Sequence, residues 1–288
     1  MGATVRELYS VFKLRIGFAI AFSAIAGLAV TPGPALPAWK IVVLSLAVLM
    51  SAASAGAFNQ FIERDLDARM NRTKNRPFVT GKYQADGWWL FTIVGLLVVS
   101  VGAAAMALNV VAAFYVFAGA FVYGVVYTVW LKRRTWMNIV IGGLSGSFAV
   151  LAGAAAVDPG LSPVPVVLAL VLFLWTPPHF WALAAMLRED YAKAGVPMLP
   201  VVVGNPAAAW VILAHTVALV AVSIVPFFLG LGWLYLVAAL LGGGVFILRS
   251  LQFVIEPTRD VARVAFRASL IQLCLLLIGA VGDRWLFA

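Results

Sequence analysis

Long apolar runs constrain this chain more than any other feature of its sequence. Segments of roughly 20 apolar residues are long enough to cross the hydrocarbon core of a bilayer as helices. Because 64% of the 288 residues are hydrophobic and 11% are charged, the chain has too little polar surface for a soluble protein. The sequence therefore predicts an all-α integral membrane protein, a bundle of nine transmembrane helices. Their expected spans are residues 13–32, 39–63, 88–108, 110–131, 137–156, 163–187, 207–228, 231–248 and 265–283.

The basic residues indicate how the bundle lies in the membrane. If the N-terminus is cytoplasmic, 18 of the 20 Lys and Arg residues fall in inner segments, and only Lys40 and Arg284 fall in outer ones. Cytoplasmic loops carry such an excess of basic residues. We expect a multi-pass protein of the cell inner (cytoplasmic) membrane, with its N-terminus in the cytoplasm and its C-terminus outside. The net charge of +9 is spread over short loops, so it does not indicate nucleic acid.

We expect one domain over residues 1–288, with the helices around a central cavity that opens to the cytoplasmic side. Two charged segments, 59–77 and 188–200, lie about 120 residues apart and each follows a long apolar run. This spacing suggests two four-helix halves, about residues 13–131 and 137–248, followed by a ninth helix.

The charged run of residues 59–77 indicates a site for chemistry. Asn59, Glu63 and Asp67 are four residues apart, which places them on one ridge of a helix. Their oxygen atoms suit Mg²⁺, which completes its shell with water and phosphate oxygens. The alternative is a solvated loop whose acids pair with neighbouring arginines. Basic residues that suit a diphosphate follow at alternate positions: Arg72, Lys74 and Arg76.

A second basic group, Lys132 and Arg133, follows Tyr127 on the same expected side of the membrane. By itself the group is typical of a cytoplasmic anchor. It becomes a phosphate contact only if the fold brings it close to the acids. Asn138 either caps the next helix or lines the cavity.

A third region surrounds the double proline Pro177 and Pro178, which we expect to break or kink its helix. His179 follows directly and shares a helical face with Asp190. An ionisable group within a membrane segment favours a substrate role over a hydrogen-bonded core position. Nearby aromatic rings either pack or face the cavity, where they can stabilise a cation.

These residues resemble the UbiA superfamily of membrane prenyltransferases, whose marker N-x-x-x-D-x-x-x-D stands here as Asn59, Glu63 and Asp67. Longer segments, spread over about residues 55–205, are similar to the branch of the superfamily that makes heme O. They are DLDARMNRTKNRP (65–77), YTVWLKRRTWMNIVIGG (127–143), WTPPHFWALA (175–184) and DYAKAGVPMLPVV (190–202).

The resemblance implies that farnesyl diphosphate ionises with the help of Mg²⁺ and that its C1 joins a vinyl group of heme B. It implies catalytic roles for Asn59, Glu63, Asp67 and His179, with the first three and Asp190 as metal ligands. The implied diphosphate contacts are Arg72, Lys74, Arg76, Lys132, Arg133 and Lys193. The implied heme or prenyl cavity residues are Tyr127, Asn138, Trp175, His179 and Phe180. Implied partners are the lipid bilayer and, downstream, a heme A synthase or the assembly of a terminal oxidase.

One departure from the superfamily bears on the substrate. Many members carry a second aspartate-rich motif, whereas the corresponding stretch here keeps only Glu189 and Asp190 as acids. This argues against a prenyltransferase for quinone-precursor aromatics, which is the first alternative. A transporter is the second, because broken helices and intramembrane acids also occur in transporters.

Overall fold

The computed structural model describes residues 3–287, and within this range the chain forms helices joined by loops, without a strand. The elements are α1 (Ala3–Val11), α2 (Leu14–Ala29), α3 (Ala38–Ile62), α4 (Arg64–Arg69), α5 (Gly87–Ala107), α6 (Val110–Phe121), the π-helix η1 (Val122–Leu131), α7 (Asn138–Gly142), α8 (Leu144–Val157), α9 (Pro163–Met186), α10 (Arg188–Lys193), α11 (Leu199–Phe228), α12 (Trp233–Ile255) and α13 (Arg259–Phe287).

The apolar runs do form membrane-length helices. Within the described residues, eight helices are long and apolar enough to span a bilayer, and α1 with α2 makes a ninth span if this pair, bent by 49°, counts as one. The all-α membrane bundle is thus confirmed, while the division into two related halves stays a prediction. Helices α12 and α13 extend beyond the expected spans 231–248 and 265–283. Their extra turns carry arginines, whose long side chains can reach water from a helix end.

The structure differs from two local expectations about where helices are interrupted. The ridge that carries the acids is not one helix, because α3 ends at Ile62 and Glu63 separates it from α4. The one-turn spacing survives nevertheless, since the Glu63 N–H donates to the Asn59 carbonyl (3.0 Å) and the Asp67 N–H to the Glu63 carbonyl (2.8 Å). Conversely, α9 continues through Pro177 and Pro178, so these prolines do not break the helix, and the expected kink stays a prediction.

The span of residues 110–131 changes character halfway. It begins as α6 and continues as the π-helix η1, which is wider than an α-helix because its hydrogen bonds join residues five apart. The pattern ends with the Lys132 N–H donating to the Tyr127 carbonyl at 2.9 Å. Such wide turns are frequent at functional sites. Thr128 lies within this π-helix, and Lys132 directly follows it.

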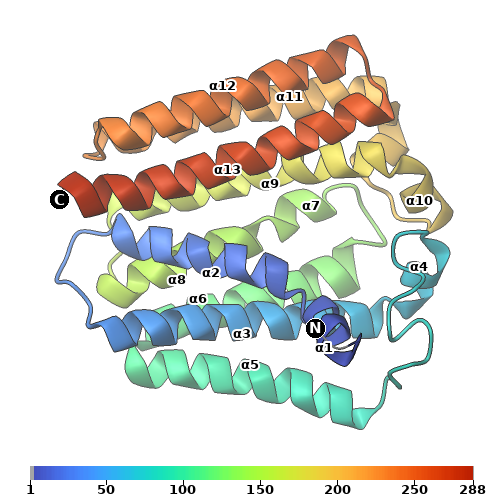
Figure 1. Cartoon of the computed structure of the whole chain (residues 1–288), viewed down its shortest axis with the longest axis horizontal. Helices are drawn as coiled ribbons and strands as arrows, with labels where there is room; N and C mark the ends of the chain where they lie inside the picture. Colours follow the sequence, from blue (N-terminus) through green and yellow to red (C-terminus); the bar gives the residue numbers. More distant parts are fainter. Residues whose placement is uncertain (1–2, 288) are drawn as a thin grey trace.

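The helices pack along one another, and the short helices α4 and α10 lie together at one end of the bundle, opposite the C-terminal end of α13 (Figure 1). Helices α2 and α8 cross especially closely. A Cβ atom on Gly153 would lie 1.8 Å from the Ala24 carbonyl oxygen, and one on Gly27 would lie 2.1 Å from that of Val150. Small residues at membrane helix interfaces permit this approach.

Candidate active site

The acids of the Asn59–Asp67 segment lie at the α4 end of the bundle and are shielded from water. Asn59, Glu63 and Asp67 are 2%, 1% and 3% exposed. Asn59 comes from the last turn of α3, Glu63 from the break between α3 and α4, and Asp67 from α4. Buried carboxylates are costly unless a cation or hydrogen bonds compensate them. The groups that neutralise these carboxylates therefore indicate which kind of ligand the site can hold.

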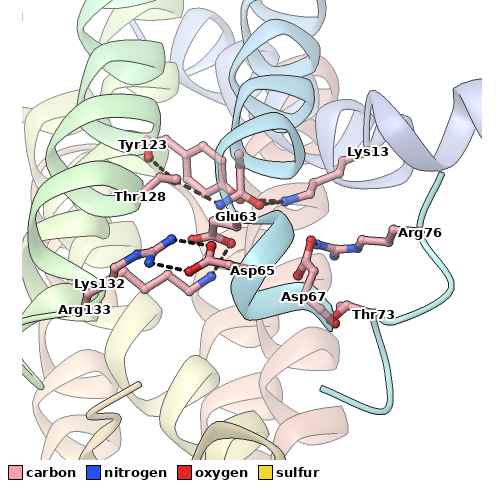
Figure 2. Close-up of polar contacts among 11 residues, drawn as sticks. Lys13, Glu63, Asp65, Asp67, Thr73, Arg76, Tyr123, Thr128, Lys132 and Arg133 are labelled. Carbon is pink, nitrogen blue, oxygen red and sulfur yellow. Dashed lines mark hydrogen bonds and ion pairs between the residues drawn. The ribbon is translucent and has the colours of Figure 1, made fainter. Parts of the chain in front are cut away.

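Each of these three residues contacts a different basic side chain, and Figure 2 shows the contacts of Glu63 and Asp67. The Glu63 carboxylate accepts from the Lys132 ammonium at 2.5 Å, and the Asp67 carboxylate from the Arg76 guanidinium at 2.6 Å. The Asn59 amide oxygen accepts from the Lys13 ammonium at 2.6 Å. The fold thus brings Lys132 to the acids, which its functional interpretation requires.

The donor set fits Mg²⁺ in its chemistry. Two carboxylates and an amide oxygen are hard ligands of the kind that Mg²⁺ takes. One carboxylate oxygen, Glu63 Oε1, is buried without a hydrogen-bond partner among the described residues. No cluster of three or more His, Cys, Asp or Glu side chains that could hold a metal occurs in residues 3–287, so Asp190 does not join Glu63 and Asp67 there.

Arg133 pairs outside this buried site. Its guanidinium donates two bonds of 2.7 Å to the Asp65 carboxylate, and the two side chains are 40% and 48% exposed. The hydrogen bond from Arg133 is the main cause that lowers the pKa of Asp65. The Arg133–Asp65 pair therefore lies at the surface and not in the buried site. A diphosphate contact of Arg133 stays a prediction.

Three further basic residues predicted to bind diphosphate, Arg72, Lys74 and Lys193, are exposed at the same end of the bundle. The buried Asp190 accepts from the Asn71 amide at 3.2 Å, which links the loop after α4 to α10. Asn71 and Asp190 line a polar pocket, whose lining does not include Arg72, Lys74 or Lys193. The lining of this pocket includes Asn71, Arg188, Asp190, Asn205 and Arg259.

His179 lies in an aromatic stack between α9 and α13. Its ring stacks on Trp175 at 4.1 Å and on Phe266 at 4.7 Å, while Phe180 meets its edge at 5.1 Å. The Ser269 hydroxyl donates to the Phe266 carbonyl (2.6 Å), so His179 Nδ1, 2.7 Å from that hydroxyl, carries the proton. None of these partners of His179 belongs to the acid cluster. Because α9 ends at Met186, His179 and Asp190 lie on different helices, and the predicted shared helical face is not formed. A heme-facing role of His179, Trp175 and Phe180 stays a prediction.

The other two predicted cavity residues, Tyr127 and Asn138, are buried. Tyr127 stacks on Tyr123 at 5.5 Å, and the Lys132 ammonium lies 5.6 Å from its ring centre. Asn138 is fully buried and donates to the Thr135 carbonyl at 2.6 Å, while its own side-chain oxygen has no partner among the described residues. It does not cap a helix through a side-chain bond.

Sequence reasoning missed three residues of this site. Lys13 and Tyr123 line an apolar pocket that begins beside Asn59, and Thr128 accepts from the Asn59 amide at 3.0 Å. In the sequence, Lys13 is one of many charges expected on the cytoplasmic side. Its position between the apolar residues Phe12 and Leu14 is the one signal that sets it apart.

Comparison with known proteins adds to this geometry. Residues 20–274 match the UbiA prenyltransferase family. Protoheme IX farnesyltransferase 2 of Paramagnetospirillum magneticum is 58% identical over 277 residues, which is 96% of either chain. Protoheme IX farnesyltransferase 1 of the same organism is 45% identical, over 98% of this chain and 99% of that one.

Solved structures share the fold at low identity. A digeranylgeranylglyceryl phosphate synthase superposes with a TM-score of 0.77 at 19% identity, over 96% of this chain and 99% of that one. A UbiA homolog from Archaeoglobus fulgidus bound to GPP and Mg²⁺ gives 0.71 at 16% identity, with the same coverage.

Proposed function

The chain belongs to the UbiA prenyltransferase family, and on that basis we propose that it transfers a farnesyl group from farnesyl diphosphate to a vinyl group of heme B, giving heme O. The observation that carries this proposal is the 58% identity, over 96% of both chains, to a protein named protoheme IX farnesyltransferase 2. The buried acids and their basic partners supply the matching chemistry.

The reaction needs a stabilised leaving group and a dry site. The C1–O bond of farnesyl diphosphate breaks with its electron pair on the diphosphate, and C1 bonds to the vinyl group. Water then adds to the resulting cation and loses a proton, which leaves a hydroxyethylfarnesyl side chain. Fixed charges act more strongly on a developing anion in a site without water than in bulk solvent.

Different residues of the buried cluster would bind the metal and stabilise the charge of the diphosphate. Asn59, Glu63 and Asp67 would hold Mg²⁺, which when bound supplies Lewis acidity to the departing diphosphate. Lys132 and Arg76 hold positive charge within hydrogen-bond distance of these ligands, where a diphosphate would meet it. Burial of the cluster keeps water from capturing the allylic cation before the vinyl group does.

We also propose that the α4–α10 end of the bundle faces the cytoplasm in the inner membrane, and that the central cavity opens there. The N-terminus would then be cytoplasmic and the C-terminus outside. Support comes from the basic residues, of which 18 of 20 fall in the expected inner segments. Heme O made here would pass to a heme A synthase or to the assembly of a terminal oxidase.

Reconstitution tests the proposal directly. Purified protein in liposomes receives Mg²⁺, farnesyl diphosphate and either heme B or 4-hydroxybenzoate as acceptor. We expect heme O, identified by its mass, together with one diphosphate for each heme consumed. Prenylation of 4-hydroxybenzoate alone would instead identify a quinone-precursor enzyme, and the absence of any diphosphate release would contradict prenyl transfer.

A further inference from the structure

Lys13 enters the bundle through an unusual backbone conformation. It lies between α1 and α2, where the chain bends by 49°, and its φ and ψ of 49° and 39° are left-handed. This conformation is unfavourable for a residue with a Cβ atom, and such strain persists where the surrounding structure enforces it, often at functional sites. The bend directs the lysine side chain between α3 and η1 (Figure 2).

The ammonium of Lys13 is held by neutral oxygen atoms. It donates to the Asn59 side-chain oxygen at 2.6 Å and to the Tyr123 hydroxyl at 3.0 Å. Within residues 3–287 no carboxylate lies within 4.0 Å of it, whereas Lys132 and Arg76 each have one. A charge inside a membrane protein is costly without a counter-ion. Lys13 is therefore the one cation of this cluster whose charge is left for an anionic ligand.

The pocket next to Lys13 has the polarity of an amphiphile. Its lining comes from α2, α3, α6, η1 and α8, and Lys13 is the only charged residue in it. Beyond the lysine the walls are formed mainly by small and apolar side chains, among them Ile16, Ala52, Ala55 and Ala120. A ligand that fits this arrangement has an anionic head at Lys13 and an apolar chain that points away from Asn59.

We propose that Lys13 binds the diphosphate of the prenyl donor and fixes it beside the amide oxygen of Asn59. The inference rests on the proposed function, because that function supplies the ligand class. Lys13 joins Lys132 and Arg76, so that basic residues from three separate segments of the chain surround one anion. Its share in binding is electrostatic, and an uncharged donor of hydrogen bonds does not replace it.

Binding measurements on the full-length protein in detergent test the inference. Lys13→Gln keeps N–H groups that can reach Asn59 and Tyr123 but removes the charge, and Lys13→Arg keeps the charge. With Mg²⁺ present, we expect Lys13→Gln to raise the Kd for farnesyl diphosphate about 10- to 100-fold, as for a lost charge-assisted hydrogen bond. Binding of farnesol and of heme B should stay unchanged, and Lys13→Arg should recover most of the affinity.

The matched control is Lys82→Gln. Lys82 lies at the same end of the bundle but pairs with Glu7 at the surface, so this variant should bind farnesyl diphosphate normally. Unchanged affinity in Lys13→Gln, or an equal loss for farnesyl diphosphate and farnesol, would overturn the inference and leave prenyl transfer intact. If the unaltered protein binds no farnesyl diphosphate, the proposed function fails first.

A second measurement needs no variant and so does not depend on Lys13→Gln folding. Lys13 is half-buried and lines the pocket, so formaldehyde with a hydride donor should methylate its amine slowly. Farnesyl diphosphate should protect Lys13 in the unaltered protein, farnesol should protect it less, and exposed Lys82 should react in all cases. Equal reaction of Lys13 with and without farnesyl diphosphate, or none in either case, contradicts the inference.

Discussion

The neighbouring residues Lys132 and Arg133 each form an ion pair, but only the pair of Lys132 is buried. This difference in burial predicts how much each pair contributes to stability. The Lys132–Glu63 pair is 11% and 1% exposed, while the Arg133–Asp65 pair is 40% and 48% exposed. Removing one partner of a buried pair costs about 3–5 kcal/mol, because the other charge stays buried alone. Exposed pairs contribute roughly 0–1 kcal/mol. We expect Lys132→Met to lower the free energy of unfolding far more than Arg133→Met.

Unfolding by SDS in mixed micelles measures both variants under one condition. The double variant Glu63→Gln with Lys132→Met should regain part of the loss, since it leaves no buried charge of that pair unpaired. Equal losses for Lys132→Met and Arg133→Met would show that the Glu63 carboxylate finds another partner.

Asp67 and Asp65 give a matched test of catalysis. Asp67 is buried among the proposed metal ligands, and Asp65, two residues earlier, is exposed. Asp67→Asn keeps the shape of the side chain but loses its charge, and removing one contact of this kind commonly lowers the rate by about 10²–10³-fold. Asp65→Asn should retain nearly the full rate. Initial rates of heme O formation per folded protein, at several Mg²⁺ concentrations, compare them.

At this scale, the sequence predicts which residues carry chemistry better than it predicts what each one contacts. The spacing of Asn59, Glu63 and Asp67 was enough to predict one site for these three residues, whereas the place of Lys132 beside Glu63 became known only from the fold. The partners Lys13 and Arg76 depend on turns whose dihedral angles no periodicity encodes. The stacking of His179 on Phe266 likewise joins residues 87 positions apart, so it follows only from the packing of α9 on α13.

The crossing of α2 and α8 predicts a strong effect for one methyl group. A Cβ atom at Gly153 would lie 1.8 Å from the Ala24 carbonyl oxygen, which belongs to backbone and cannot rotate away. Gly153→Ala must push the helices apart, at a cost of about 1–3 kcal/mol or more. Gly146 lies in the same helix, and a methyl group there would have nothing within 4 Å, so Gly146→Ala should be neutral or slightly stabilising. Thermal unfolding in detergent distinguishes the two, and equal midpoints would contradict the crossing.

The bend at the start of α11 predicts a different kind of glycine effect. Gly204 has φ of 80° and ψ of 162°, a region that is nearly exclusive to glycine. A methyl group there would meet nothing closer than Pro206 Cδ at 3.7 Å, so any cost is conformational rather than steric. Gly204→Ala should destabilise by roughly 1–3 kcal/mol. Gly244→Ala, within α12 and without close neighbours, is the control in the same unfolding measurement.

Element positions follow closely from the apolar pattern, and element interruptions do not. Spans 39–63 and 88–108 agree with α3 and α5 to within one residue. The widening of η1, the break at Glu63 and the continuity of α9 through Pro177 depend on tertiary contacts that reward an otherwise poor backbone geometry. The apolar pattern gives the length of each hydrophobic segment. A break or widening of the helix within a segment leaves that length unchanged, so the pattern does not reveal it.

The orientation of the whole molecule can be tested with two single-cysteine variants. Cys274 is exposed on α13, so the background carries Cys274→Ser. Pro159, between α8 and α9, should face the outside, and Ala192, in α10, should face the cytoplasm. A membrane-impermeant maleimide should label Pro159→Cys in intact spheroplasts but label Ala192→Cys only after lysis. The reverse pattern would contradict both the orientation and the proposed cytoplasmic entry of substrate.

The close crossing of α2 and α8 also divides the glycines of this protein for anyone who wishes to thermostabilise it. Gly95, Gly102, Gly146 and Gly244 face open space and can accept alanine, so they are sites where helix stiffness can be increased. Gly27 and Gly153 cannot, because neighbouring backbone fills the volume that a methyl group would need. A consensus or library approach that treats all helical glycines alike would therefore lose at one contact what it gains at the others.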